Sequence, residues 1–182
     1  MTEQSRMREE ITRFAKSIYD RGLTSGSTGN ISARLSDGTI LMTPTGSSMG
    51  FLDPAQISHL SEDLRLLSGD APTKEIPLHT AFYETRVTTG AVVHLHSTHS
   101  VALSMLPDTD PDNVLPPLTP YAVMKLGKVQ LLPFFMPGDA AMGEAVRGLA
   151  GKRSAVLLAN HGPVVAGKDL AAAVYAMEEL EE

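Results

Sequence analysis

The sequence predicts an α/β fold, because segments with the apolar pattern of strands alternate with segments that have the pattern of helices. In the second half of the chain, the apolar runs 91–96, 129–132 and 155–159 are separated by helical segments at 97–105 and 139–150. Such alternation is typical of α/β proteins. The pattern predicts the class of fold and leaves the strand directions open.

The first half of the chain supports the same class with a helix and a hairpin. Apolar residues recur at intervals of four, three and four, which places them on one helix face: Met7, Ile11, Phe14 and Ile18. Gly22 marks the end of this helix. Asp37 and Gly38 give a strong hairpin signal between the extended runs 30–35 and 39–43. We expect further elements in this order: a short helix at 54–57, a strand at 64–67 and a helix at 77–86.

Length and composition predict one domain over residues 1–182. The chain has 182 residues, 42% of them hydrophobic, which is enough for one sizeable core. Its last helix, predicted from Asp169, ends on acidic residues without a glycine cap, where the helix dipole disfavours negative charge. We therefore expect this C-terminal helix to be truncated.

Charge and hydropathy exclude several kinds of partner. The formal net charge is −6, and no cluster of Lys and Arg offers a surface for nucleic acid. No apolar run approaches the roughly 20 residues that cross a bilayer. With no Cys, the chain forms no disulfides and supplies no thiolate metal ligands. We expect a soluble cytoplasmic protein that binds neither nucleic acid nor membranes.

The most informative motif is a pair of histidines, His94 and His96, at the end of an apolar run. Residues two apart in an extended strand share a face, so these two imidazoles can converge on one ion. A second apolar run leads to His161. Three histidines that leave one coordination position open are typical of a catalytic Zn²⁺ site. His99 is an alternative ligand, whereas His79 is expected to pack in the core or to hydrogen-bond around the site.

Five short motifs resemble, in order and spacing, those of the class II aldolase and adducin family. They are residues 29–32, 43–46, the pair Lys74 and Glu75 ahead of His79, residues 94–96 and residues 160–162. The resemblance covers essentially the whole chain. Three segments, residues 45–54, 94–99 and 118–124, resemble the 3-oxo-tetronate 4-phosphate decarboxylase branch of the family.

The resemblance implies a fold, an assembly and a catalytic centre. The fold is a three-layer αβα sandwich around a largely antiparallel sheet, and the assembly is a homotetramer with active sites between subunits. The implied metal ligands are His94, His96 and His161, which bind Zn²⁺, with Mn²⁺ or Co²⁺ as alternatives. The implied catalytic carboxylate is Glu75. A tyrosine that aldolases of the family receive from the neighbouring subunit corresponds to Tyr121.

The resemblance also implies a phosphate pocket. The positions that match it are Ser27, Gly29, Asn30, Thr45 and Gly46. Aldolases of the family have two serines before the catalytic glutamate, where this chain has Thr73 and Lys74, so one hydroxyl is kept and a cation is added. Small residues in such loops let backbone N–H groups approach a phosphate closely.

Together, these features predict a metal-dependent lyase that acts on a phosphorylated sugar acid. A divalent ion that chelates a ketone and its neighbouring hydroxyl stabilises the enediolate left when a carbon–carbon bond breaks. If CO₂ departs, the reaction is decarboxylation of 3-oxo-tetronate 4-phosphate to dihydroxyacetone phosphate. If an aldehyde departs, the enzyme is a sugar-phosphate aldolase, such as a fuculose-phosphate aldolase, or a ribulose-phosphate-type epimerase that uses the same step. A non-catalytic, adducin-like scaffold is the remaining alternative.

Overall fold

The computed structural model describes residues 1–182 and contains six α-helices, two short 3₁₀ helices and eight strands. The helices are α1 (Glu3–Asp20), η1 (Met49–Phe51), η2 (Pro54–Gln56), α2 (Ile76–Thr85), α3 (Thr98–Ser104), α4 (Pro120–Leu126), α5 (Ala140–Gly148) and α6 (Leu170–Glu181). The strands are β1 (Asn30–Arg34), β2 (Ile40–Met42), β3 (Ser58–Leu60), β4 (Leu66–Ser68), β5 (Ala91–His94), β6 (Gln130–Leu132), β7 (Ala155–Leu158) and β8 (Gly162–Gly167). None of the helices has both the length and the apolar character needed to span a membrane.

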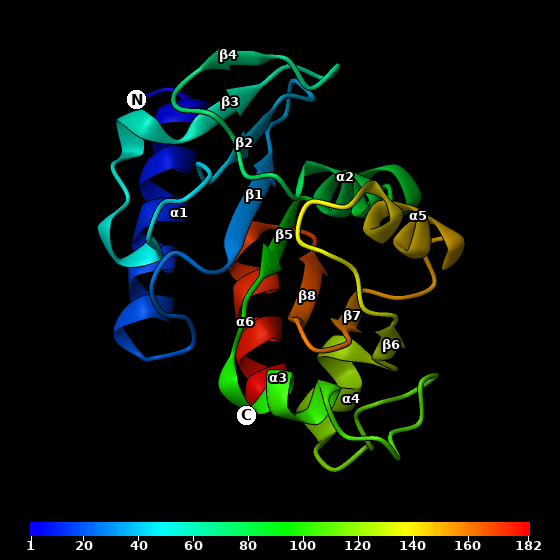
Figure 1. Cartoon of the computed structure of the whole chain (residues 1–182). Coiled ribbons are helices and arrows are strands. Elements are labelled where there is room, and N and C mark those ends of the chain that lie inside the picture. The colour runs from blue at the N-terminus through cyan, green and yellow to red at the C-terminus, as the bar shows by residue number, and fades with distance from the viewer.

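All eight strands belong to one sheet, with the order β4-β3-β2-β1-β5-β8-β7-β6 (Figure 1). Every neighbouring pair is antiparallel except β6 and β7, which are parallel. Strands β1, β5 and β8 form the centre, where Asn30 pairs with His94 and His94 pairs with Val164. The largely antiparallel sheet expected from the family resemblance is confirmed.

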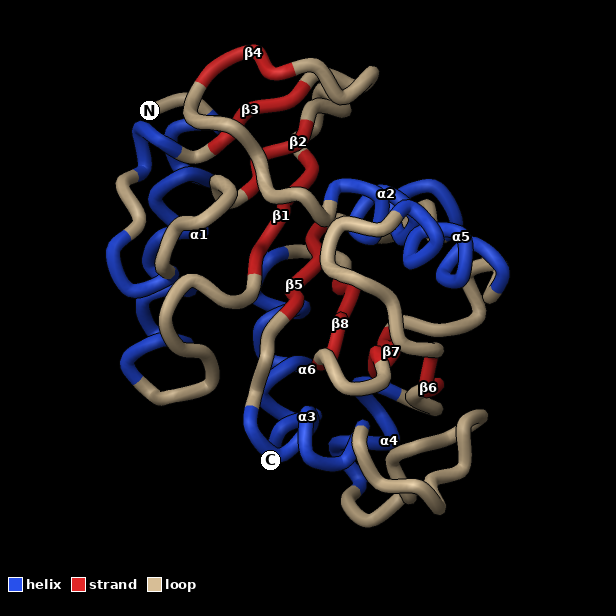
Figure 2. Tube along the Cα trace, viewed as in Figure 1, coloured by secondary structure: helices blue, strands red, loops and turns tan.

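Helices cover both faces of the sheet, so the molecule has three layers (Figure 2). On one face, Val93 of β5 packs in a core with α1, α4 and α6. On the other face, Val92 packs in a second core with α2 and α5. Successive residues of a strand point to opposite faces, so a single strand feeds both cores. The predicted αβα sandwich is therefore confirmed.

Strand β1 alternates polar and apolar side chains in a way that prepares the site. Ile31 and Ala33 face the core of α1 and α6. Asn30 and Ser32 point the other way, toward α2, and both are buried. Buried polar side chains are costly unless they are hydrogen-bonded, so this face of β1 requires polar partners on α2.

Strand β5 ends at His94, so it is shorter than the predicted run 91–96. Its neighbour β1 begins at Asn30, which is the residue paired with His94. On the other side the ladder reaches Pro163, whose carbonyl accepts from Leu95 at 3.2 Å but which has no N–H to donate. His96 therefore lies just beyond the paired strand.

Four elements have no counterpart among those expected from the sequence: η1, β3, β8 and α4. Strand β3 is short, and β8 begins with Gly162 and Pro163, which are unusual in a strand. Helix α4 starts at Pro120 after Thr119, whose side chain accepts from the N–H of Ala122 at 3.1 Å. This capping signal is visible in the sequence, but the elements expected above include no helix at this position.

Candidate metal centre and active site

The structure brings together the three histidines expected to bind a metal. Their nearest side-chain nitrogens all lie within 4.8 Å of one another. The ring centroids of His94 and His161 are 4.8 Å apart, and those of His96 and His161 are 4.7 Å apart. Metal–nitrogen bonds of about 2 Å let one ion bridge such a group with small side-chain adjustments. His94 is fully buried, and His161 is nearly so.

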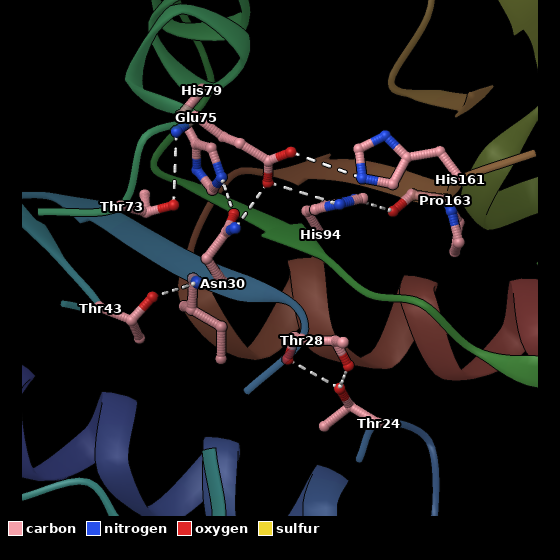
Figure 3. Close-up of polar contacts among 11 residues, drawn as sticks. Thr24, Thr28, Asn30, Thr43, Thr73, Glu75, His79, His94, His161 and Pro163 are labelled. Carbon is pink, nitrogen blue, oxygen red and sulfur yellow. Dashed lines mark hydrogen bonds and ion pairs between the residues drawn. The ribbon is translucent and has the colours of Figure 1, made fainter. Parts of the chain in front are cut away.

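The proton on His94 can be assigned from its hydrogen bond. Its Nδ1 lies 2.9 Å from the carbonyl oxygen of Pro163, which can only accept (Figure 3). Nδ1 therefore carries the proton and Nε2 presents a lone pair. That Nε2 atom is buried without a hydrogen-bond partner. Fixing the tautomer of a metal-binding histidine through its other nitrogen is usual in metal sites.

A tight turn between β7 and β8 presents His161. The N–H of His161 bonds to the carbonyl of Leu158 at 3.1 Å, and Asn160 between them has a positive φ of 55°. Asparagine tolerates this conformation better than most residues. The turn is tied to α3, because the hydroxyl of Ser104 accepts from the N–H of Asn160 at 3.1 Å. Gly162 follows and packs against the segment just after β5, where a Cβ would lie 2.2 Å from the carbonyl oxygen of Leu95.

Glu75 lies at the beginning of α2 and points into the histidine cluster (Figure 3). Its Oε2 lies 3.5 Å from Nε2 of His94, and its Oε1 lies 3.5 Å from Nε2 of His161. Burial alone would raise the pKa of this carboxyl. The neighbouring His94, a hydrogen bond from Asn30 and His161 outweigh burial, so the pKa of Glu75 lies below its ordinary value. The group is therefore a carboxylate at neutral pH.

These groups fit a divalent cation. Burial lowers the pKa of all three histidines, to about 4 for His161, so the rings are neutral and offer lone pairs. Oε1 of Glu75 and both ring nitrogens of His161 are buried without hydrogen-bond partners. Each neutral ring keeps one nitrogen lone pair, and these lone pairs gather beside a buried carboxylate, so the cluster is rich in acceptors that a cation would balance. Neutral imidazoles suit Zn²⁺ and other first-row metals.

A pocket of about 560 Å³ opens beside the cluster. His96 and His161 line it together with Val101 of α3, Met105 directly after that helix, and Phe134, Phe135 and Pro137. A substrate in this pocket would meet two of the three imidazoles. His99 does not line it, because its exposed ring lies 3.0 Å from Glu181. The structure therefore places His99 outside the group of histidines that could hold a metal ion.

The loops expected to bind phosphate lie at the same end of the sheet. Residues 43–46 and 71–75 run side by side, with the N–H of Thr45 bonded to the carbonyl of Ala71 at 2.9 Å. The N–H of Thr73 bonds to the carbonyl of Thr43 at 3.2 Å, and the Thr73 hydroxyl accepts from the N–H of Glu75 at 3.3 Å. Because β1 begins where β2 ends, the loop before Asn30 reaches the same edge. Ser27, Thr45, Gly46 and Lys74 are exposed there, and Gly29 is half-buried.

Two of the predicted residues have surroundings that differ from those expected. The Asn30 side chain is buried, and both its polar atoms are engaged, with Nδ2 donating to Glu75 and Oδ1 bonded to His79. It is not free to face an anion in this structure. Tyr121 lies on the outer side of α4, 62% exposed, and its ring lies beside the ammonium of Lys125 rather than in the histidine cluster.

Pro163 contributes to the site without any sequence motif. It acts through its backbone carbonyl, which any residue possesses, so no side-chain pattern could reveal it. Ser32 and Tyr83 are also linked to the site, because the Ser32 hydroxyl hydrogen-bonds to both Nδ1 of His79 and the hydroxyl of Tyr83. His79 thus hydrogen-bonds around the site, as expected. The signal for Ser32 is a polar residue on an alternating strand, at the position where an apolar one would ordinarily pack.

Comparisons with known proteins agree with this geometry. Residues 9–182 match the family model described as the class II aldolase and adducin N-terminal domain. The chain is 51% identical over 180 residues to the 3-oxo-tetronate 4-phosphate decarboxylase of Escherichia coli K12, which covers 99% of this chain and 84% of the relative.

Solved structures show the same relationship. Escherichia coli YgbL, described as an aldolase/epimerase/decarboxylase, superposes with a TM-score of 0.96 at 48% identity, covering 99% of this chain and 87% of that chain. A sugar-phosphate aldolase from Thermotoga maritima gives a TM-score of 0.84 at 27% identity, covering 97% of this chain and 92% of that chain. The chain belongs to the class II aldolase and adducin family.

Proposed function

We propose that this protein is a metal-dependent carboxy-lyase that converts 3-oxo-tetronate 4-phosphate into dihydroxyacetone phosphate and CO₂. The observation that carries the proposal is the complete set of three histidines and one carboxylate, in a chain 51% identical to a decarboxylase of that name. Identity to the sugar-phosphate aldolase of known structure is 27%, which favours the decarboxylase.

His94, His96 and His161 are the proposed metal ligands, with Zn²⁺ as the ion and Mn²⁺ or Co²⁺ as substitutes. When bound, such an ion would supply a Lewis acid that stabilises negative charge developing on the substrate's ketone and hydroxyl oxygens. The protein's own contribution is to hold the rings neutral by burial and to fix His94 through the carbonyl of Pro163.

Glu75 is the proposed proton carrier. Loss of CO₂ breaks the bond between C1 and C2 and leaves the electron pair on C2, which must then take up a proton. Oε2 of Glu75 is held by Asn30, whereas Oε1 has no hydrogen-bond partner. Because the resting group is a carboxylate, it takes up a proton before it delivers one to C2.

We propose that Ser27, Gly29, Thr45, Gly46, Thr73 and Lys74 hold the substrate phosphate. Their loops meet at one end of the sheet, next to Glu75. Lys74 is exposed and adds a positive charge suited to a dianion. The Asn30 side chain is already engaged, so its contribution to phosphate binding would have to come from its backbone or from a rearranged amide.

The proposed assembly is a homotetramer of single-domain chains with sites between subunits. One continuous sheet carries both cores, which supports a single domain. Large apolar side chains are exposed around α3, α4 and the pocket rim: Met105, Leu106, Tyr121, Met124, Phe134 and Met136. A neighbouring subunit would cover this surface, and Tyr121 is the proposed contribution to that subunit's active site.

An aldolase or an epimerase is the second candidate, because both would use the same metal and carboxylate. The description of YgbL, at 48% identity, names aldolase, epimerase and decarboxylase as alternatives, so the shared fold does not separate them. An adducin-like scaffold is disfavoured, since a site freed from catalysis would be expected to lose ligands that are all present here.

Product analysis tests the proposal. Metal-loaded protein is incubated with 3-oxo-tetronate 4-phosphate, and CO₂ and triose phosphate are measured together. Equal amounts of both products support the decarboxylase. If the protein releases no CO₂ from this substrate but releases triose phosphate from a ketose phosphate, the aldolase replaces the decarboxylase as the proposed function. Glu75→Gln should retain the metal and lose most turnover. Glu84→Gln, which alters an exposed glutamate at the far end of α2, is the matched control.

A further inference from the structure

Behind Glu75, buried polar side chains form one continuous chain of hydrogen bonds. Asn30 donates to Oε2 of Glu75 at 2.7 Å, and Oδ1 of Asn30 lies 2.5 Å from Nε2 of His79. Nδ1 of His79 lies 2.7 Å from the hydroxyl of Ser32, which lies 2.8 Å from the hydroxyl of Tyr83. All five residues are buried. The series of hydrogen bonds runs from the active-site carboxylate to Tyr83 in the last turn of α2 (Figure 3 shows its first part).

The direction of every hydrogen bond follows from the carboxylate. A carboxylate can only accept, so the NH₂ group of Asn30 faces Glu75 and its carbonyl oxygen faces His79. That oxygen also can only accept, so Nε2 of His79 carries a proton. A neutral ring then has a bare Nδ1, which accepts from the hydroxyl of Ser32. The Ser32 oxygen in turn accepts from the hydroxyl of Tyr83.

Electrostatics are consistent with this assignment. Burial lowers the pKa of His79 to about 3, so its ring is neutral at ordinary pH and carries a single proton. Burial also raises the pKa of Tyr83, so its hydroxyl keeps the proton that it donates. Each group therefore donates its hydrogen bond in the direction of Glu75. Reversing any one of these hydrogen bonds would leave a buried polar atom without a partner.

Two residue spacings bring the polar side chains of α2 and β1 opposite one another. Glu75, His79 and Tyr83 follow one another at intervals of four along α2, so they lie on one helix face. Asn30 and Ser32 are two apart on β1 and share the strand face toward α2. Four helical residues advance about 6 Å and two strand residues about 6.7 Å, so the polar positions of the two elements match.

We propose that Asn30, His79, Ser32 and Tyr83 are positioning residues that hold the Glu75 carboxylate for proton transfer. By donating in one direction, they fix Oε2 and leave Oε1 without a hydrogen-bond partner beside His161, where the substrate carbon would lie. The catalytic consequence rests on the function proposed above, whereas the hydrogen-bond directions rest on the structure alone. The proposal also assigns Asn30 a role beyond phosphate binding.

Two measurements test the proposal separately. The first is ¹⁵N NMR of the histidine rings in the metal-loaded protein, which reports the tautomer of His79 without any substrate. A neutral ring protonated on Nε2 supports the chain. Protonation on Nδ1, or a charged ring at neutral pH, would overturn it. This readout stands even if the wild-type protein releases no CO₂, in which case the proposed function fails alone.

The second measurement compares matched variants in the CO₂ assay. Ser32→Ala and His79→Leu break the chain, and we expect kcat to fall about 10- to 100-fold with KM and metal content close to wild type. His79→Gln keeps a donor near the Nε2 position and should restore part of kcat. Thr80→Val removes another buried hydroxyl of α2, one that bonds only within its own helix.

The pattern across these variants decides the outcome. A loss in Ser32→Ala and not in Thr80→Val supports positioning, because both variants delete one buried hydroxyl. Equal losses in the two, a rise in KM without a change in kcat, or no loss in Ser32→Ala would overturn it. Since His79→Leu risks misfolding, Ser32→Ala and Tyr83→Phe, each of which removes little more than one hydroxyl, provide the decisive comparison.

Discussion

The carboxylate of Glu181 accepts hydrogen bonds from both the backbone N–H and the hydroxyl of Ser100, at 3.0 and 2.6 Å. It also accepts from the N–H of His99 at 2.8 Å. These N–H groups belong to the first turn of α3, whose N-cap Ser97 supplies no side-chain hydrogen bond. A residue of α6 therefore caps α3, directly after the proposed metal ligand His96.

Removal of this cap should destabilise the protein. Glu181→Gln keeps the shape of the side chain and loses its charge, and we expect the free energy of unfolding to fall by about 1 kcal/mol. Urea unfolding measures the change, with Glu182→Gln, an exposed neighbour, as the control. Equal midpoints in the two variants would mean that Glu181 is not a cap.

The same carboxylate should contribute to the pH dependence of stability. Burial alone would raise the pKa of Glu181, but hydrogen bonds from Ser100 and His99 outweigh it, so the pKa lies below the ordinary value. The stabilisation is thus complete above the pKa of the unfolded chain and is lost as the pH falls through the folded pKa. Urea titrations of wild type and Glu181→Gln should converge at low pH, and a constant difference would contradict this linkage.

Gly162→Ala should disturb the turn that carries His161. An added Cβ would lie 2.2 Å from the Leu95 carbonyl oxygen, and the φ of +154° at Gly162 disfavours other residues. We expect a lower melting temperature and weaker metal binding. Gly148→Ala is the matched control, because nothing lies within 4 Å of its added Cβ and alanine favours a helix by about 0.5–1 kcal/mol. Unchanged metal affinity in Gly162→Ala would be evidence against this close approach.

His79 should make the protein less stable in acid. Its pKa is about 3 in the folded state because of burial, whereas the unfolded chain takes up the proton near the ordinary value of 6.5. The unfolded state therefore binds more protons between these values, and stability falls as the pH drops through that range. His79→Gln should flatten this slope in urea titrations of chelator-treated protein. An identical slope in both proteins would show that His79 is already charged.

Metal removal should lower the stability of the protein, and the metal content of single variants should identify the ligands. An ion present at 100 times its dissociation constant stabilises the folded state by about 2.7 kcal/mol. Chelator treatment should therefore lower the melting temperature of wild type and leave that of His161→Ala almost unchanged. Metal content per chain, measured after dialysis, should fall in His161→Ala and stay at wild type in His99→Ala. Full metal content in His161→Ala would remove this residue from the ligand set.

Much of the fold follows from local patterns in the sequence. The period of Met7, Ile11, Phe14 and Ile18 predicts α1, and the turn at Asp37 and Gly38 predicts the β1–β2 hairpin, both as observed. Strand directions do not follow, because pairing partners such as Asn30 and His94 are separated by a long stretch of chain. Strand β8 is not predicted, because it begins with Gly162 and Pro163, which are uncommon in strands.

The candidate site divides in the same way. The histidines and Glu75 are visible as residue types at suggestive spacings, and the structure places them together. The hydrogen-bond partner of His94 is a backbone carbonyl and leaves no trace in the sequence. The environment of Asn30 depends on the packing of α2 against β1, which a linear pattern cannot specify.

The histidine cluster and Glu75 draw on the end of β5, the β7–β8 turn and the start of α2, which lie far apart along the chain. No short stretch of the chain holds all of these groups, so an ion would be captured only after the central strands have aligned. Loss of the ion on heating should then coincide with global melting, which would make bound metal an inherent reporter of the intact native state.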